Sequence, residues 1–315
     1  MLASDARPAS CVSRRRVLLS VSCLVLAVVV AAAVWPLIGP PIADAAEGLG
    51  RIRLELILLA GALFAAAPIG CGLAWHDAIQ HAGGRIGRLD ACARYGVGSF
   101  VNSVAPAHLG DLVRAVLLIE KLPAGGRRRI VPWFGVMQVA RLAALVALAL
   151  AAALPWFLLP LAVLAPVAIV LATLGRGTTR LVCLSFLSPL AKAAAIAVIL
   201  VGLDVGAPLD ALAVVPALEL AALVPLTPGN VGVAGAAAAG ALYAQGIPMT
   251  EAVQAGLVLH AVETAAGIAY GSVASLAWIV GLGPVRSLMQ GSRALKSAAA
   301  HAAGAGRIQA DATKP

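Results

Sequence analysis

Long apolar runs, each about as long as a bilayer is thick, dominate this chain of 315 residues. A helix rises about 1.5 Å per residue, so roughly 20 apolar residues cross a hydrocarbon core of about 30 Å. The runs do not alternate with a period of two, and backbone groups in lipid need partners within the membrane. They therefore predict helices rather than barrel strands. The candidate spans are residues 17–38, 54–75, 130–153, 155–174, 181–203 and 252–282.

The composition excludes a soluble fold. The chain is 61% hydrophobic and 12% charged, whereas soluble domains are about half apolar and about a quarter charged. A soluble protein of this length has no place for so much apolar surface, so lipid must cover part of it. The net charge of +9 does not indicate nucleic acid as a partner, because the basic residues gather in short clusters between apolar runs, as membrane topology signals do.

Two further apolar regions, residues 95–119 and 211–244, are interrupted by proline and glycine. Each predicts two short helices that meet at a polar turn, the first at residues 102–106 and the second at 227–230. Irregular backbone at membrane depth is tolerated only where protein or water surrounds it. This favours two re-entrant hairpins, and the alternative is a proline-kinked helix or a surface loop. The predicted fold class is therefore an all-α polytopic membrane helix bundle with about six spans and two re-entrant helical hairpins.

The distribution of basic residues predicts the orientation of this bundle. Of the 23 Lys and Arg residues, three lie within apolar segments and two lie outside if the N-terminus is cytoplasmic, which leaves 18 inside. This follows the positive-inside rule. The first hairpin then enters from the cytoplasm and the second from the far side. Interrupted segments in two oppositely oriented halves are the pattern of an inverted-repeat transporter, so an inverted repeat is expected.

The chain divides into three parts. A basic cytoplasmic N-terminus (residues 1–16) precedes the transmembrane domain (17–283), and a polar cytoplasmic tail (284–315), expected to be disordered, follows it. Basic residues before an apolar run also suit a cleaved signal peptide, but the run from Val17 to Val34 is long for a signal core. We expect a retained first helix and a location in the inner (plasma) membrane.

Charged residues inside membrane segments are costly and usually functional. Asp111 and Arg114 are three residues apart on one helical face and can pair. They follow Asn102, Pro106 and Gly110 and open a short helix, whose N-terminal N–H groups and positive dipole end suit a phosphate. The alternative is that Asp111 caps the helix and Arg114 extends to the membrane surface.

The second polar turn provides the other candidate site. Thr227 and Asn230 can bond a ligand head group, while Pro228, Gly229 and Gly232 allow an irregular backbone and a close approach. The alternative is helix packing, because small residues also bring membrane helices together.

Four more charged residues lie in apolar segments. Glu219 and Glu263 either take a proton or pair with Arg141 or Lys192. No nucleophile, nucleotide-binding or metal-ligand motif stands out, and none of the five cysteines forms a CxxC pair. We therefore predict no enzyme activity, no cofactor and no metal.

At these turns the chain resembles the transmembrane domain of the lysylphosphatidylglycerol synthases, a family of flippase-like membrane proteins. The first family motif, N-x-x-x-P-x-x-x-G-[DE]-x-x-R-A, is matched in full by Asn102, Pro106, Gly110, Asp111, Arg114 and Ala115. The second, P-x-T-P-G-G-x-G-x-x-E, is matched by Pro225, Thr227, Pro228, Gly229 and Gly232, with Asn230 for a glycine and Gly235 for the glutamate. A third, E-R-x-x-D, keeps only Arg141, with Ala140 and Ala144 at its acidic positions.

The resemblance implies a function and a set of binding residues. It implies that the chain moves an amphiphilic lipid (a phospholipid, isoprenoid lipid or glycolipid) between leaflets and that the motif residues bind it. Membrane lipids are then the expected partners. The alternative is a non-transporting scaffold subunit of a lipid or envelope-glycan biosynthetic enzyme, which would be the partner in that case.

Overall fold

The computed structural model describes residues 46–104, 109–154, 168, 178–223 and 231–282. Every regular element in these ranges is a helix, and none of the described residues forms a strand. Within these ranges four helices are long and apolar enough to cross a membrane. The predicted all-α class is thus confirmed, and the chain is a membrane protein.

The four long helices correspond to four of the six predicted spans. They are α2 (Leu54–His81), α5 (Gly126–Ala153), α7 (Thr179–Leu203) and α10 (Met249–Ala277), which a π-helical turn, η5 (Trp278–Leu282), continues. The run at 17–38 and, apart from residue 168, the run at 155–174 lie outside the described residues. Helix α2 extends past the predicted end at residue 75 because its last polar side chains find partners, described below.

Each interrupted region forms two packed helices, as predicted. Helices α3 (Arg88–Val104) and α4 (Leu109–Ile119) make the first pair. The second pair is α8 (Ala211–Ala221), which follows the short helix η3 (Pro208–Asp210), and α9 (Val231–Ala244). The predicted start of the first region at Tyr95 was wrong, because α3 begins at Arg88.

Helices α2 and α7 pack antiparallel along their lengths and form the axis of the fold. At one end, Gly202 of α7 leaves so little room that a β-carbon there would lie 2.7 Å from Ile52, just before α2. At the other end, the buried carboxylate of Asp77 accepts from His76 Nδ1 at 2.9 Å and pairs with Arg180 Nε at 3.2 Å. This pair connects the last turn of α2 to the first turn of α7.

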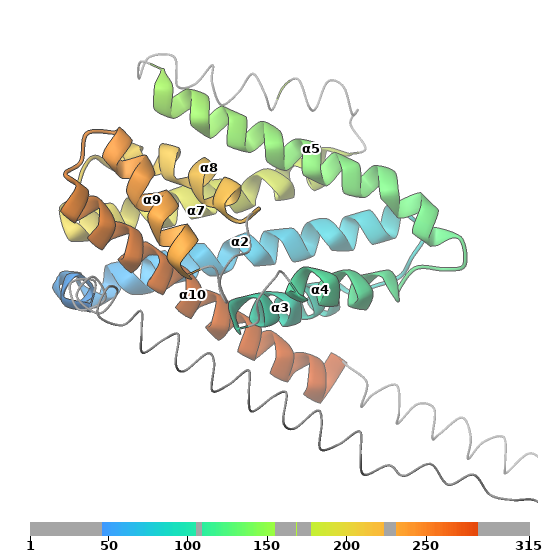
Figure 1. The fold of residues 1–315 in the computed structure, drawn as a ribbon. Coiled ribbons are helices and arrows are strands. Elements are labelled where there is room, and N and C mark those ends of the chain that lie inside the picture. Colours follow the sequence, from blue (N-terminus) through green and yellow to red (C-terminus); the bar gives the residue numbers. More distant parts are fainter. Residues whose placement is uncertain (1–45, 105–108, 155–167, 169–177, 224–230, 283–315) are drawn as a thin grey trace, which may run out of the picture.

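Two apolar cores form at opposite ends of this axis. The larger surrounds the first half of α2 and the end of α7, and helices α8, α9 and the first half of α10 supply the rest of it. The smaller surrounds the second half of α2 and draws on α3, on Leu118 of α4 and on the first half of α5. Figure 1 shows the consequence: the α3–α4 pair and the α8–α9 pair lie toward opposite ends of α2.

A small residue, Gly271, allows α10 to pack closely against α3. A β-carbon at Gly271 of α10 would lie 2.6 Å from Cβ and 2.8 Å from Cα of Phe100. The hydroxyl of Tyr270 donates to the carbonyl oxygen of Cys92 at 2.8 Å. Because lipid tails are as apolar as the side chains, such close contacts rather than water exclusion hold membrane helices together.

We expect Gly271→Ala to lower the stability of the protein by about 1–3 kcal/mol, because the added methyl overlaps the backbone of α3. Gly61→Ala is the matched control, since Gly61 lies in α2 and a β-carbon there meets nothing within 4 Å. Alanine favours a helix over glycine, so the control is expected to match or exceed wild type. Thermal melts of the two purified variants in detergent measure the difference, and equal melting temperatures would contradict it.

Candidate functional site

The residues of the first motif converge where α3 meets α4. The Asn102 side-chain amide donates to Asp111 Oδ1 at 2.8 Å, and Arg114 Nη2 lies 2.6 Å from the same oxygen. The predicted pairing of Asp111 with Arg114 is therefore confirmed. Pro106 lies outside the described residues, so the turn between the two helices is not part of this geometry.

Gly110 packs closely against α3. A β-carbon on Gly110 would overlap the carbonyl oxygen of Gly98 and the side-chain amide of Asn102. The two helices thus approach backbone to backbone at Gly98 and Gly110, which places Asn102 within reach of Asp111. Any larger residue at position 110 would separate the helices.

Arg94 holds the same pair of helices at its other end. Its side chain is only 4% exposed, and it pairs with Asp90 Oδ1 at 2.8 Å and with Glu120 Oε2 at 3.1 Å. Nη1 also donates to the carbonyl oxygen of Leu117 at 2.6 Å, in the last turn of α4. In the sequence, Arg94 is one of the basic residues between apolar runs and so indicates only topology. The spacing to Asp90, four residues earlier, was the available clue to a structural role.

Arg114 is turned inward and not toward the membrane surface. Its guanidinium carbon lies 4.4 Å from the ring centroid of Tyr95, and the side chain is 16% exposed. Among the described residues the buried Nε–H donates to no acceptor. A guanidinium that is stacked on one face and paired at one nitrogen keeps further donors for an anion.

Tyr95, Asp111 and Arg114 border a cleft of about 450 Å³ between α4 and α5. Residues of α2, α3 and α7 also line it. Apolar side chains line most of it, among them Trp75 and Phe134, whose ring centroids lie 5.7 Å apart. Three arginines also face it, namely Arg114, Arg127 and Arg141. A mostly apolar cleft that also has a few cations in its wall suits an amphiphilic ligand with an anionic group.

One face of α5 forms a wall of the cleft. Its lining residues recur at intervals of three or four and are Arg127, Ile130, Val131, Phe134, Met137, Gln138 and Arg141. This spacing is one stripe along a helix. Arg127 and Arg141 are fourteen residues apart in the sequence, which corresponds to about 21 Å along the axis of α5. The cleft therefore runs from its outer end, at Arg127 in the first turn of α5, to its inner end, at Arg141 in the middle of that helix.

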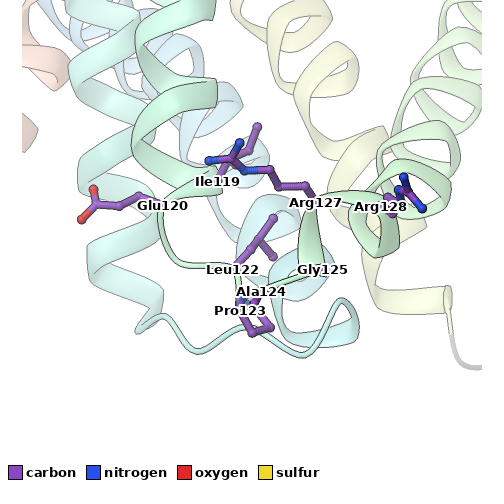
Figure 2. A pocket seen from close by; sticks show the side chains of 8 residues that line it. All are labelled: Ile119, Glu120, Leu122, Pro123, Ala124, Gly125, Arg127 and Arg128. Atoms are coloured by element: carbon purple, nitrogen blue, oxygen red, sulfur yellow. The ribbon is translucent and has the colours of Figure 1, made fainter.

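A second hollow, of about 640 Å³, adjoins the outer end of the cleft at the loop between α4 and α5. Figure 2 shows Arg127 extending from the start of α5 toward Ile119 at the end of α4, whereas Glu120 points away from the loop. Ile119 and Arg127 line both hollows. No motif residue lines this one, so we place the candidate site in the cleft.

The inner end of the cleft meets a cluster of four charged residues from four helices. Arg141 of α5 pairs with Glu219 of α8, and Lys192 of α7 lies 3.1 Å from Glu219 Oε1 and 2.8 Å from Glu263 Oε1 of α10. Of the two predicted roles for the glutamates, pairing with Arg141 and Lys192 is confirmed. Arg141 belongs to both the cluster and the cleft, and its side chain remains 36% exposed.

The departures from the family motifs have a structural counterpart. Ala140 and Ala144, where the motif has acidic residues, are fully buried in a small core with Val182 and Phe186 of α7. Arg141 instead takes its carboxylate from Glu219 of α8, one of the predicted partners, which is 78 positions away in the sequence. A β-carbon added at Gly235 would lie 3.4 Å from a side-chain methyl carbon of Leu257 in α10, an ordinary van der Waals distance.

The second turn stays a prediction. Thr227, Pro228, Gly229 and Asn230 lie outside the described residues. Gly232 is described, and no described atom lies within 4 Å of a β-carbon placed there. The close approach predicted at Gly232 is thus not seen among the described residues.

The chain matches no model of a known protein family. No curated protein matches it either. Among the described residues, no group of three His, Cys, Asp or Glu side chains is placed to hold a metal ion.

We expect Glu219→Ala to destabilise the protein by about 3–5 kcal/mol, because it leaves the partly buried Arg141 and Lys192 short of an anion. Glu55→Ala is the matched control: Glu55 is 83% exposed and 3.9 Å from Arg53, and exposed pairs contribute about 1 kcal/mol or less. Melting temperatures in detergent compare the two. A Glu219→Ala protein as stable as the control would show that the cluster contributes little to stability.

Proposed function

We propose that the chain is a flippase-like membrane protein of the lysylphosphatidylglycerol synthase transmembrane family, with no catalytic activity of its own. It binds an amphiphilic lipid with an anionic head group in the cleft between α4 and α5 and moves that lipid between leaflets. One observation carries this proposal. Arg114, Arg127 and Arg141 line a cleft whose remaining wall is mostly apolar.

The opening of the cleft supports a lipid rather than a water-soluble anion. Val131 and Phe134 line the cleft and are also 64% and 42% exposed, respectively. The apolar wall is therefore continuous with the outer apolar surface of α5, which lipid would cover in a membrane. A head group can pair with the arginines while its acyl chains run out past Val131 and Phe134.

In this proposal the protein lies in the inner (plasma) membrane. It has six spans and two re-entrant hairpins, and both termini are cytoplasmic. The positions of the α3–α4 and α8–α9 pairs toward opposite ends of α2 support hairpins that enter from opposite sides. The outer end of the cleft, at Arg127, then lies near the cytoplasmic surface.

Labelling of single cysteines tests this topology. In a protein whose five native cysteines are replaced, we expect Arg128→Cys and Leu209→Cys to react from opposite sides of the membrane. Both positions are exposed, so neither substitution disturbs the core. Modification of both by the same impermeant reagent in intact cells would contradict the proposed topology.

Arg114→Gln is expected to weaken the binding of phosphatidylglycerol by about ten- to a hundredfold, the effect of one lost charge-assisted hydrogen bond of about 1.5–3 kcal/mol. Arg114→Lys should recover only part of the loss, because an ammonium group lacks the planar fork and stacks less well on Tyr95. Arg51→Gln is the matched control, since Arg51 is 66% exposed and pairs with Glu47, four residues earlier in the sequence.

Native mass spectrometry with phosphatidylglycerol and phosphatidylcholine measures this binding in folded protein. Equal binding by Arg114→Gln and Arg51→Gln would remove Arg114 from the site. Movement between leaflets is tested separately, by leaflet-specific quenching of fluorescent phosphatidylglycerol in vesicles that contain the protein. Binding without movement would favour the scaffold function over transport.

A further inference from the structure

The four-residue cluster at the inner end of the cleft is electrically balanced only while Arg141 belongs to it. Arg141 and Lys192 contribute two positive charges, and Glu219 and Glu263 contribute two negative charges. Lys192 is the only other cation that the structure records in contact with either glutamate among the described residues. If Arg141 leaves, one cation remains for two carboxylates. Like charges that share one partner in a poorly solvated site disfavour full ionisation.

Arg141 is placed to leave. It reaches Glu219 through Nη2, lines the cleft and is 36% exposed, whereas Glu219 is 10% exposed. An anionic head group that enters the cleft therefore meets Arg141 from the open side and competes with Glu219 for it. Glu219 would stay in place, because Lys192 also holds it at 3.1 Å.

We propose that binding of an anionic head group at Arg141 is coupled to the uptake of one proton by the Glu219–Lys192–Glu263 cluster. The inference rests on the proposed function, and it assigns an energy source to the proposed lipid movement. The proton comes from the aqueous phase and forms an O–H bond on one carboxylate. The cluster, now without Arg141, then returns to zero net charge. The lipid anion and the proton thus bind together, and a proton gradient can bias the direction in which the lipid moves.

The other titratable groups near the cluster define the alternatives. His260 of α10 lies within electrostatic reach of Glu263 on the same helix, and its Nε2 lies 3.4 Å from the Thr264 hydroxyl. Cys71 of α2 and Tyr95 of α3 lie within electrostatic reach of Arg141. Asp111 borders the cleft from α4 and pairs with Arg114. A head group that displaced Asp111 would also cause proton uptake, so the experiment separates the two sites.

Calorimetric titration of the full chain in detergent with a short-chain phosphatidylglycerol tests the coupling. The phosphodiester of this probe does not titrate near neutral pH, unlike a phosphate monoester, whose second pKa is about 6. Titrations in buffers of different ionisation enthalpy give the number of protons bound. We expect uptake of up to about one proton per lipid, and an affinity that falls by up to about tenfold for each pH unit of increase. Short-chain phosphatidylcholine is the zwitterionic control.

Two substitutions locate the proton. Glu219→Gln and Glu263→Gln each remove one negative charge, so the cluster stays neutral after Arg141 leaves. Each variant is expected to bind phosphatidylglycerol with little proton uptake and with nearly equal affinity at about pH 6 and about pH 8. Asp111→Asn is expected to retain the proton uptake of wild type in whatever binding remains. If one glutamine variant does not fold, the other and the wild-type protein still decide the question.

The outcomes separate this proposal from the proposed function. Binding of phosphatidylglycerol without proton uptake and without pH dependence would overturn the coupling and leave the lipid site standing. No binding at any pH would overturn both. Proton uptake that persists in both glutamine variants but is lost in Asp111→Asn or His260→Asn would place the proton elsewhere and overturn the assignment to the cluster.

Discussion

The pairing of Arg141 and Lys192 with Glu219 and Glu263 is the interaction on which the arrangement of α5, α7, α8 and α10 depends. A single charge of this kind at membrane depth would have to reach water or lose its ionisation. Four charges from α5, α7, α8 and α10 can stay because each has an opposite partner. The requirement also fixes geometry, since the four helices must present these side chains at one level. Buried ion pairs often add little to stability, but they are effective at selecting one arrangement over others.

Elsewhere in the bundle, close contacts at glycines hold helices together, a role that large side chains have in soluble proteins. Gly98 meets Gly110, and Gly271 meets Phe100, so α3 lies close to both α4 and α10. Such contacts give dispersion and hydrogen bonding without relying on exclusion of water, which is absent in lipid. The polar ties at the two ends of the α3–α4 pair, Asn102 with Asp111 and Arg94 with Leu117, then set the register of the pair.

Much of this fold could be predicted from the sequence. Hydropathy located the four long helices, and proline and glycine located the breaks between α3 and α4 and between α8 and α9. Both signals are local in the sequence, so they can be recognised without knowledge of the tertiary structure. Helix ends were less predictable: α2 continues to His81 because the buried Asp77 pairs with Arg180, which lies far away in the sequence at the start of α7. The Asp111–Arg114 pair was predictable from a spacing of three residues.

The cleft itself could not be predicted, because its residues come from distant segments. Nothing in the local pattern around Arg141 points to Glu219, since the motif suggests acidic partners within the same helix, and here those positions are alanines. Arg127 counted only as a topology signal until the structure placed it on the same stripe as Arg141. Similarly, Tyr95 lacked any signal that would connect it with Arg114.

The stripe of lining residues on α5 has a consequence for how this site can change over evolutionary time. All of its members share one helical face, so a substitution alters one contact and leaves the other six in place. Inserting or deleting a single residue between Phe134 and Met137 would turn everything beyond it by about 100° around the helix axis. Arg141 would then face away from both the cleft and Glu219. The site therefore tolerates changes of residue far better than changes of length, and a four-residue insertion, which nearly restores the phase, is the smallest that leaves both arginines on the same face.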